Sequence, residues 1–403
     1  MNPGELRERA EALRLAGPRA LHETVLRHKP WIDKMYGVNH GVFLRITAPV
    51  PPAEAKEFAA FRKVIDQAAQ QKDAALSGLY WYTDQRAARE VAQEQGKPII
   101  YLRLLGNLYD ERSCANSRFF RTVLYTDPAI AKRLREDFIL CWESERPVPE
   151  LTISFGDGRK LEQTITGNSA HYAWLPDGQV MDVLPGLFKP EAFHRWLEQM
   201  TELARRCGTD ADRGETLRAY HQDELKRSRE DWAALLTRME AHSGTQAGHP
   251  STFFSRLVGA GPKPEDLVEM TSFWRSAAKM EPVPVLSKQA LAVIRAQQGR
   301  PDAKNAMLFA VSKMRVEDPV MRKIRTFRDS VAVDTLYNTH LIYRRVHERL
   351  STGHISESQA VLNQWVYAEL FKTPANDPWL GLAPASVYTG LTADGKTFVR
   401  QGK

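Results

Sequence analysis

The stretch "GKPIIYLRLLGNLYDERSCANSRFFRTVLYTDP" (residues 96–128) decides how the chain is expected to fold. Its first part, "KPIIYLRLLG", is a short apolar run with a proline at its beginning, which is typical of a buried strand. Its later part, from Ser117 onward, has the apolar spacing of a helix. Cys114, one of only three cysteines, stands between the two parts. The stretch therefore predicts a strand, a loop and a helix that begins near Cys114.

The segments on both sides of this stretch extend the pattern. Upstream, "DQRAAREVAQEQ" predicts a helix that Asp84 caps and Gly96 ends. Downstream, "FILCWES" predicts a strand, "TISFGDGRKLEQTI" a hairpin, and "HYAWLPDGQVMDVLPG" a strand, a turn and a strand. The segment "KPEAFHRWLEQMTELARR" then predicts a closing amphipathic helix. Strands that first alternate with helices and then end in a hairpin predict an α/β domain with a mixed sheet at about residues 77–205.

The regions before and after this domain have helical periodicity. We expect helices at 3–29 and 53–76, with an extended segment at 35–52 between them. Beyond residue 208 we expect helices at 213–242, 265–279, 286–298, 302–314, 318–350 and 355–371. The tail is expected to be an ordered loop, in which "NDPWLGLAP" (376–384) either fills a groove of the helical domain or lines a pocket. The predicted organisation is thus a helical region (1–76), the α/β domain (77–205) and a mostly α-helical domain with a loop tail (206–403).

Composition and charge narrow the classes of function. The chain is 43% hydrophobic and 26% charged, an ordinary globular profile, and no apolar run is long enough to span a membrane. Its net charge of +7 is spread over short basic pieces, which predicts a solvated basic surface and no nucleic-acid partner. Three cysteines do not indicate a disulfide framework. No secretory signal is visible, so we expect a cytoplasmic location, with a periplasmic one as the alternative if a signal has been removed.

The middle third resembles the thioredoxin fold, especially its larger branch with a helix before the active-site strand. The pieces that carry the resemblance are Trp81, the helix "QRAAREVAQEQ", the strand "GKPIIYLRL", and the spacing from Cys114 to Asp127 and Pro128. The strand "FILCWES", the segment "TGNSAHYAWLPDGQ" and the closing helix follow in the family's order. The resemblance implies a thioredoxin-like domain at about 77–205, and it does not extend to the helical regions on either side.

The sequence departs from the family's pattern at three points. The family has a second cysteine where this chain has Ser117, so the motif here is Cys-x-x-Ser. The family's cis-proline would fall near Ser169, and no proline stands there. The tryptophan that usually precedes the first cysteine is also absent. These departures put the family's activity in greater doubt than its fold.

We expect Cys114 to lie exposed at the start of a helix, where unpaired backbone N–H groups and the helix dipole favour negative charge. Such a position near cations lowers the pKa of a thiol from about 8.5 to roughly 3.5–7.5. Arg112 and Arg118 flank the cysteine and supply positive charge. A thiolate attacks disulfides and forms a mixed disulfide. Ser117 cannot resolve that intermediate but can donate a hydrogen bond to the sulfur, which favours chemistry completed by an external thiol.

The predicted function is therefore that of a thiol–disulfide oxidoreductase or isomerase with a single nucleophile, Cys114, assisted by Ser117. Arg112 and Arg118, together with Asn168, Ser169 and His171 of the segment expected to face the site, are the candidates for substrate contact. The expected partner is a disulfide-containing protein or a small thiol, with no cofactor and no metal. The alternative is a non-catalytic binding or scaffold protein that uses a degenerate thioredoxin fold. Substrate, electron donor and oligomeric state stay open.

The remaining polar residues suggest structural roles. Cys141 lies in an apolar strand and is expected to pack as a small hydrophobe, and Cys207 is taken as incidental. Asp329, His340 and His347 share one face of a predicted long helix. Two histidines seven residues apart are separated by a rise of about 10 Å, which favours a packed face over a shared metal. A metal or cofactor pocket in the C-terminal domain is the weakest of the alternatives.

Overall fold

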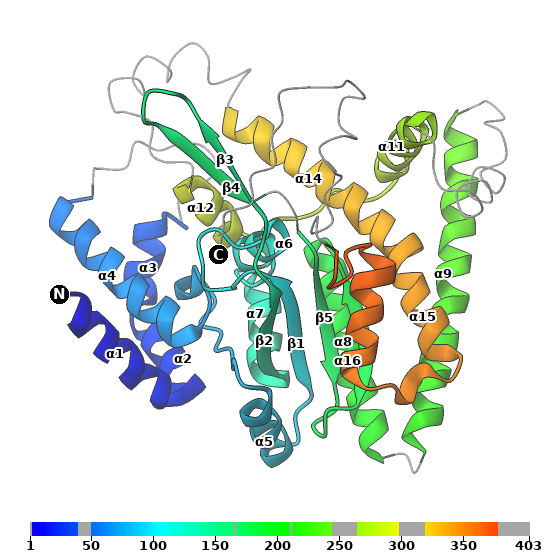
Figure 1. Cartoon of the computed structure of the whole chain (residues 1–403), viewed down its shortest axis with the longest axis horizontal. Helices are drawn as coiled ribbons and strands as arrows, with labels where there is room; N and C mark the ends of the chain where they lie inside the picture. Colours follow the sequence, from blue (N-terminus) through cyan, green and yellow to red (C-terminus); the bar gives the residue numbers. More distant parts are fainter. Residues whose placement is uncertain are drawn as a thin grey trace.

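The computed structural model describes residues 2–38, 50–164, 167–209, 212–243, 264–297 and 319–377 (Figure 1). The helix expected at 302–314 lies outside the described residues. So do most of the extended segment at 35–52 and most of the tail segment 376–384.

A four-stranded mixed sheet forms the centre of the molecule, as the sequence predicts. Its strands, in the spatial order β2-β1-β5-β6, are Ile139–Arg146, Ile99–Leu105, Ser169–Trp174 and Val180–Pro185. β1 runs parallel to β2 and antiparallel to β5, and β5 runs antiparallel to β6. Beyond β2, Tyr82 forms a parallel bridge with Cys141. The described chain is thus of mixed α/β class.

The helices of this region begin and end at the residues that the sequence singles out. Helix α5 (Gln85–Gln95) is capped by Asp84, whose carboxylate accepts from the backbone N–H groups of Arg86 and Ala87. It ends at Gly96, which adopts the left-handed conformation that favours glycine. After β1 the chain forms α6 (Ala115–Phe119), the π-helical turn η2 (Phe120–Leu124) and α7 (Pro128–Asp137). The closing helix α8 spans Pro190–Thr209.

A separate hairpin of β3 (Glu150–Ser154) and β4 (Lys160–Thr164) projects beyond the central sheet (Figure 1). Its apolar side chains Leu151, Ile153 and Leu161 are exposed. The hairpin therefore packs little of its own surface into the core.

The N-terminal helices have a core of their own. They are α1 (Pro3–Leu15), α2 (Gly17–Arg27), α3 (Lys29–Tyr36) and α4 (Pro52–Ala69), followed by the short η1 (Ala74–Leu76). Leu21, Ile32 and Ile65 are buried among them, together with Ala292 and Val293 of the later helix α12 (Lys288–Gln297). The chain thus returns to its N-terminal helices after the sheet is complete.

The C-terminal helices share the core of the sheet. They are α9 (Arg213–Ser243), α11 (Pro264–Ala278), α14 (Pro319–Tyr337), η3 (Asn338–Tyr343), α15 (Arg344–Ser351), η4 (His354–Ser356), α16 (Gln359–Trp365) and η5 (Val366–Leu370). Leu217 of α9, Val346 of α15 and Leu362 of α16 belong to one buried cluster with β1 and β5. Among the described helices, none has the length and apolarity needed to cross a bilayer.

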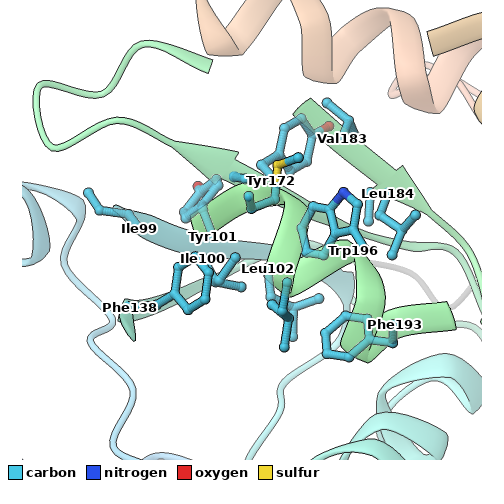
Figure 2. Packing of buried hydrophobic residues seen from close by; sticks show 14 of the residues in the cluster. Ile99, Ile100, Tyr101, Leu102, Phe138, Tyr172, Val183, Leu184, Phe193 and Trp196 are labelled. Atoms are coloured by element: carbon cyan, nitrogen blue, oxygen red, sulfur yellow. The ribbon is translucent and has the colours of Figure 1, made fainter. Parts of the chain in front are cut away.

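Both faces of the sheet are covered. Every residue of β1 is buried, and alternate side chains point to opposite faces. Figure 2 shows Leu102 and Phe193 on one side of the strands, with Tyr101 and Tyr172 on the other. On the second face the Tyr172 hydroxyl donates a hydrogen bond of 2.8 Å to Asn363 of α16. Burial of each large apolar side chain stabilises the folded state by about 1.5–3 kcal/mol. The core therefore holds the strands of the sheet in fixed positions.

Candidate functional site

Cys114 is the N-cap residue of α6, so a helix does begin where the sequence predicts. Its Sγ lies 3.4 Å from the backbone N of Ser117, 3.4 Å from Ser117 Oγ and 3.2 Å from Ser169 Oγ. The single proton of the Ser117 hydroxyl is shared with a second acceptor, the Cys114 carbonyl oxygen at 2.9 Å. Hydrogen-bond donors aimed at a sulfur stabilise its anionic form. The site is therefore one sulfur that accepts from the Ser117 backbone N–H and has two serine hydroxyls within hydrogen-bond distance. Either atom of the Cys114–Ser169 pair can be the donor.

Gly167 allows β5 to bring Ser169 to this sulfur. A Cβ at Gly167 would lie 2.8 Å from Asn116 Oδ1 and 3.0 Å from the Asn116 backbone N. Real Cβ atoms do not approach so closely, so only glycine lets this loop pack against the first turn of α6. The close approach places the first residue of β5 beside the residue that caps the helix.

Cys114 is fully buried, with 0% of its surface exposed, and the expectation of an exposed thiol is wrong. The reason is tertiary: Gly167 packs against the first turn of α6, Ser169 of β5 lies against the sulfur, and Tyr367 of the C-terminal segment lies near it. Val148 follows β2 and lies 3.2 Å from where a Cβ of Gly106 would be, which holds the loop after β1 in place. A helix start in isolation would be open to water, and these later segments remove that access.

The C-terminal cover, residues 366–377, is tied to the loop that carries Asn168. The Tyr367 hydroxyl donates to the Asn168 carbonyl oxygen at 3.3 Å, and Asn168 Nδ2 donates to Thr373 Oγ1 at 3.2 Å. The guanidinium of Arg146 reaches the Pro374 carbonyl oxygen at 3.5 Å. Burial raises the pKa of Tyr367 well above its ordinary value, and the nearby Cys114 adds to that shift. The cover is therefore held by a few polar contacts close to the cysteine.

His171 lies on β5, two residues after Ser169, and its side chain is buried. Its Nε2 is 2.7 Å from the Tyr125 hydroxyl, and both side chains are fully buried. Burial lowers the pKa of His171 to about 3, so its imidazole is neutral near pH 7. Burial also raises the pKa of Tyr125 well above its ordinary value, with Cys114 as the second cause. Ser169 and His171 are alternate residues of β5, so both face the side of the sheet on which α6 lies.

The two arginines expected to add positive charge are placed differently. Arg112 forms ion pairs with Glu162 and with Glu150, the latter at 3.4 Å, so the β3–β4 hairpin compensates its charge. Arg118 is partly exposed, and it has no ion pair within the described part of the chain. The sulfur is thus surrounded mainly by neutral donors. Substrate contact by these arginines, by Asn168, by Ser169 or by His171 stays a prediction.

Arg121 is a positioning residue that the sequence analysis missed. It is 1% exposed, and its guanidinium donates to the carbonyl oxygens of Asp110 and Glu111 and to Ser113 Oγ at 3.2 Å. These contacts fix the loop immediately before Cys114. The signal that points to it is an arginine inside the apolar run "FFRTVL", since a buried charge needs partners.

The other two cysteines are also buried and free of disulfides. Burial raises the pKa of Cys141 to about 12, which agrees with its predicted role as a small hydrophobe. Cys207 lies inside α8 and belongs to the main core. Neither thiol forms a disulfide with Cys114.

A second buried polar centre joins Asp182 of β6, His221 of α9 and His347 of α15. His221 Nδ1 lies 2.8 Å from His347 Nδ1, and His221 Nε2 lies 3.0 Å from the Met181 carbonyl oxygen. Asp182 accepts from Trp196 Nε1 at 2.9 Å. Burial raises the pKa of Asp182 to about 7, lowers that of His221 to about 4, and lowers that of His347 well below its ordinary value.

The predicted face of Asp329, His340 and His347 is not formed as expected. The π-helical turn η3 interrupts the helix at residues 338–343 and changes its phase. His340 packs against Trp232, with ring centroids 5.0 Å apart, whereas His347 meets His221. Asp329 is exposed. His347 therefore has its partners on α9 and β6, which no spacing within one helix predicts.

Comparison of the chain with family models, with curated proteins and with solved structures gives no match. The function has to be argued from the residues of the site.

Proposed function

We propose that the protein carries out thiol–disulfide exchange through Cys114. The observation that carries the proposal is the convergence of the Ser117 backbone N–H, the Ser117 hydroxyl and the Ser169 hydroxyl on Cys114 Sγ. A thiolate is the nucleophile in such reactions, and donors at a helix start favour its formation. The arrangement is local to the cysteine that the sequence singled out, and it needs no cofactor.

A thioredoxin-like interpretation of residues 77–205 supports the same conclusion. Parallel strands β1 and β2 are connected through α6 and α7, and the antiparallel pair β5–β6 and helix α8 follow. Cys114 stands between β1 and the first helix after it, which is the position of the nucleophile in that family. Ser117 occupies the position of the second cysteine.

The proposed reaction is an exchange that conserves disulfides. Cys114 Sγ attacks one sulfur of a substrate disulfide, the substrate S–S bond breaks, and the other substrate sulfur leaves as a thiolate. The product is a mixed disulfide between Cys114 and the substrate. An external thiol of low molecular weight, as its thiolate, then attacks this mixed disulfide and releases Cys114. Ser117 and Ser169 donate hydrogen bonds to the leaving Cys114 sulfur in this second step.

Access to the sulfur requires movement of the C-terminal cover. The polar contacts from the cover to the Asn168 loop are few and long, at 3.2–3.3 Å. A hydrogen bond contributes about 0.5–1.5 kcal/mol, and the burial of Val366, Tyr367 and Leu370 in the main core adds to the cost of opening. The open form is therefore a minor population reached by local unfolding of this segment. The proposal thus includes a closed form, described here, and an open form that reacts.

The experiment is to incubate the folded chain with a small symmetric disulfide and to map mixed disulfides by mass spectrometry. We expect the adduct on Cys114, its removal by excess small thiol, and its absence in Cys114→Ser. The matched control is Cys141→Ser, which should keep the adduct at the wild-type rate. Lack of any adduct on Cys114 while the protein remains folded would remove the proposal.

The second candidate is a non-catalytic binding protein, and two observations favour it. The first is the complete burial of Cys114. The second is a polar pocket of about 310 Å³ on the opposite face of the sheet, lined among others by Arg103, Glu143 and Asn363. In this case the Cys114→Ser variant would retain every activity of the protein, and substitution of Arg103 would impair it.

A further inference from the structure

Three potential metal ligands meet at the outer edge of β6. Asp182, His221 and His347 each offer one ligand atom, and these atoms all lie within 4.8 Å of one another. All three side chains are buried. Two imidazoles and a carboxylate, with a fourth position left for water, are a ligand set that zinc takes in proteins. We propose that these three residues bind a divalent transition-metal ion, and that Zn²⁺ is the ion that suits them best.

The hydrogen bonds of His221 leave the correct nitrogen free for a metal. A backbone carbonyl can only accept, so the bond from His221 Nε2 to the Met181 carbonyl oxygen places the proton on Nε2. The lone pair of Nδ1 then points at His347 Nδ1, 2.8 Å away. A ring N–H bound to a backbone carbonyl is the usual support for a histidine ligand. Without a metal, His347 must carry its proton on Nδ1. When a metal ion binds Nδ1, that proton moves to Nε2, so that both ligand rings stay neutral.

Within the residues that the structure describes, the carboxylate of Asp182 has no ion pair. It accepts from the Val183 backbone N at 2.8 Å, from Trp196 Nε1, and from the hydroxyls of Tyr220 and Tyr343. All of these donors are neutral, and no lysine or arginine of the described part of the chain is among the groups that act on the Asp182 carboxyl. A buried carboxylate normally has a positive partner. A divalent ion would supply it, with the tyrosines and the tryptophan holding the carboxylate in place.

The dimensions fit after small adjustments. Ligand bonds of about 2.0–2.2 Å place the atoms of a tetrahedral zinc site about 3.3 Å apart. The two Nδ1 atoms are closer than this and would separate by about half an ångström when the proton between them is replaced. The widest pair, at no more than 4.8 Å, would draw together.

A metal at this position would connect three segments that are far apart in the sequence. His221 and His347 are 126 residues apart, and Asp182 belongs to the sheet itself. The ion would tie the edge strand β6 to α9 and α15. Figure 1 shows these two helices side by side. The inference is independent of the reaction proposed for Cys114, because none of its ligands contacts that site.

The test uses the full chain and Zn²⁺ alone. The protein is unfolded in denaturant in the presence of a chelator and then refolded without metal. It is next titrated with Zn²⁺, and the amount of bound metal and the midpoint of thermal unfolding are measured at each step. We expect one ion per chain and a rise in the midpoint of about 3 °C when free Zn²⁺ is at about a hundred times the dissociation constant. Titration with Co²⁺ should give the visible bands of a tetrahedral ion with nitrogen and oxygen ligands.

The variants His221→Gln and His347→Gln should each lose the bound ion and the shift in midpoint, whereas His340→Gln should keep both. His340 is the control because it is a buried histidine of the same region that packs on Trp232 instead. A wild-type chain that binds no ion and shows no shift would overturn the proposal. Unchanged binding in both ligand variants would also overturn it. If the variants do not fold, the wild-type stoichiometry and the Co²⁺ spectrum decide the question.

Discussion

The Cys114 site and the Asp182–His221–His347 centre are both buried beside one sheet, the first at the start of β5 and the second at β6, yet they are built in opposite ways. The first has a soft sulfur acceptor and long contacts of 3.2–3.4 Å, made mainly within one turn of helix. The second has a buried carboxylate and contacts of 2.8–3.0 Å between separate elements. Weak local contacts leave a group free to react, whereas strong distant contacts hold a fold together. Changes at the first centre should therefore affect reactivity, and changes at the second should affect stability.

The largest expected effect is that of Asp182→Ala. It removes the acceptor of Trp196 Nε1 and of the Tyr220 hydroxyl, which are buried, and of the hydroxyl of the partly buried Tyr343. Leaving buried donors unpaired should lower the free energy of unfolding by about 3–5 kcal/mol. Urea denaturation in the presence of a chelator measures this loss without any metal contribution. The control Glu198→Ala removes a half-exposed ion pair with Arg133 and should change stability by less than about 0.5 kcal/mol. Equal stability of the two variants would show that the second centre is not structural.

The pH dependence of stability tests the buried His171. Its pKa is about 3 in the folded chain and about 6.5 when unfolded, so the unfolded state binds a proton first as the pH falls. This contribution to stability is fully present above pH 6.5 and is lost as the pH falls toward 3. Between pH 7 and pH 4 the wild type should therefore lose about 3 kcal/mol more than His171→Leu, which has no proton to bind. Denaturant unfolding of both proteins at several pH values measures the difference. Parallel pH profiles would contradict a buried neutral imidazole.

Loosening the C-terminal cover should have a moderate effect, and on reactivity alone. Tyr367→Phe removes the hydrogen bond to the Asn168 carbonyl oxygen. A loss of about 0.5–1.5 kcal/mol in the closed form raises the open population, and with it the rate of Cys114 alkylation, by about twofold to tenfold. Tyr337→Phe, in the cluster formed by α11 and α14, is the control and should leave the rate unchanged. An unchanged rate in Tyr367→Phe would mean that access to the sulfur is controlled elsewhere.

The smallest expected effect is that of Arg112→Ala. The sequence suggests that this arginine activates the thiol, whereas the structure pairs it with Glu150 and Glu162. Its ion pairs are half-exposed, so stability should change by less than about 0.5 kcal/mol. The rate of Cys114 alkylation at neutral pH should change less than twofold. A tenfold slower reaction would show that Arg112 activates the Cys114 thiol. In that case the reactivity of the site would not depend on neutral donors alone.

The comparison also explains what the sequence could predict. Some features depend only on residues a few positions apart in the sequence, and these were predicted. They include the cap Asp84, the helix end at Gly96 and the strand at 99–105. The mixed sheet that this strand belongs to was also predicted. The helix start at Cys114 follows from the same local physics. The burial of its sulfur does not, because the cover comes from residues more than two hundred positions later.

The second centre lay outside the reach of sequence reasoning. His347 was placed on a continuous helix with His340, but the π-helical turn η3 rotates the two apart. Its real partners, His221 and Asp182, belong to elements whose positions are set by the packing of the whole core. Arg121 is the exception, since a charged residue inside an apolar helical run marks a buried network even before its partners are known.

The most direct test of the account is the rate of Cys114 alkylation by iodoacetamide in the folded protein, followed residue by residue with mass spectrometry. The thiolate is the form of cysteine that reacts, so the rate reports both the opening of the cover and the effect of the donors around the sulfur. The account predicts that Cys114 is alkylated in the folded protein faster than the buried Cys141, and that Ser117→Ala and Ser169→Ala slow this reaction. Modification of Cys114 only after global unfolding, or an unchanged rate in both serine variants, would contradict the claim that this sulfur is an activated nucleophile.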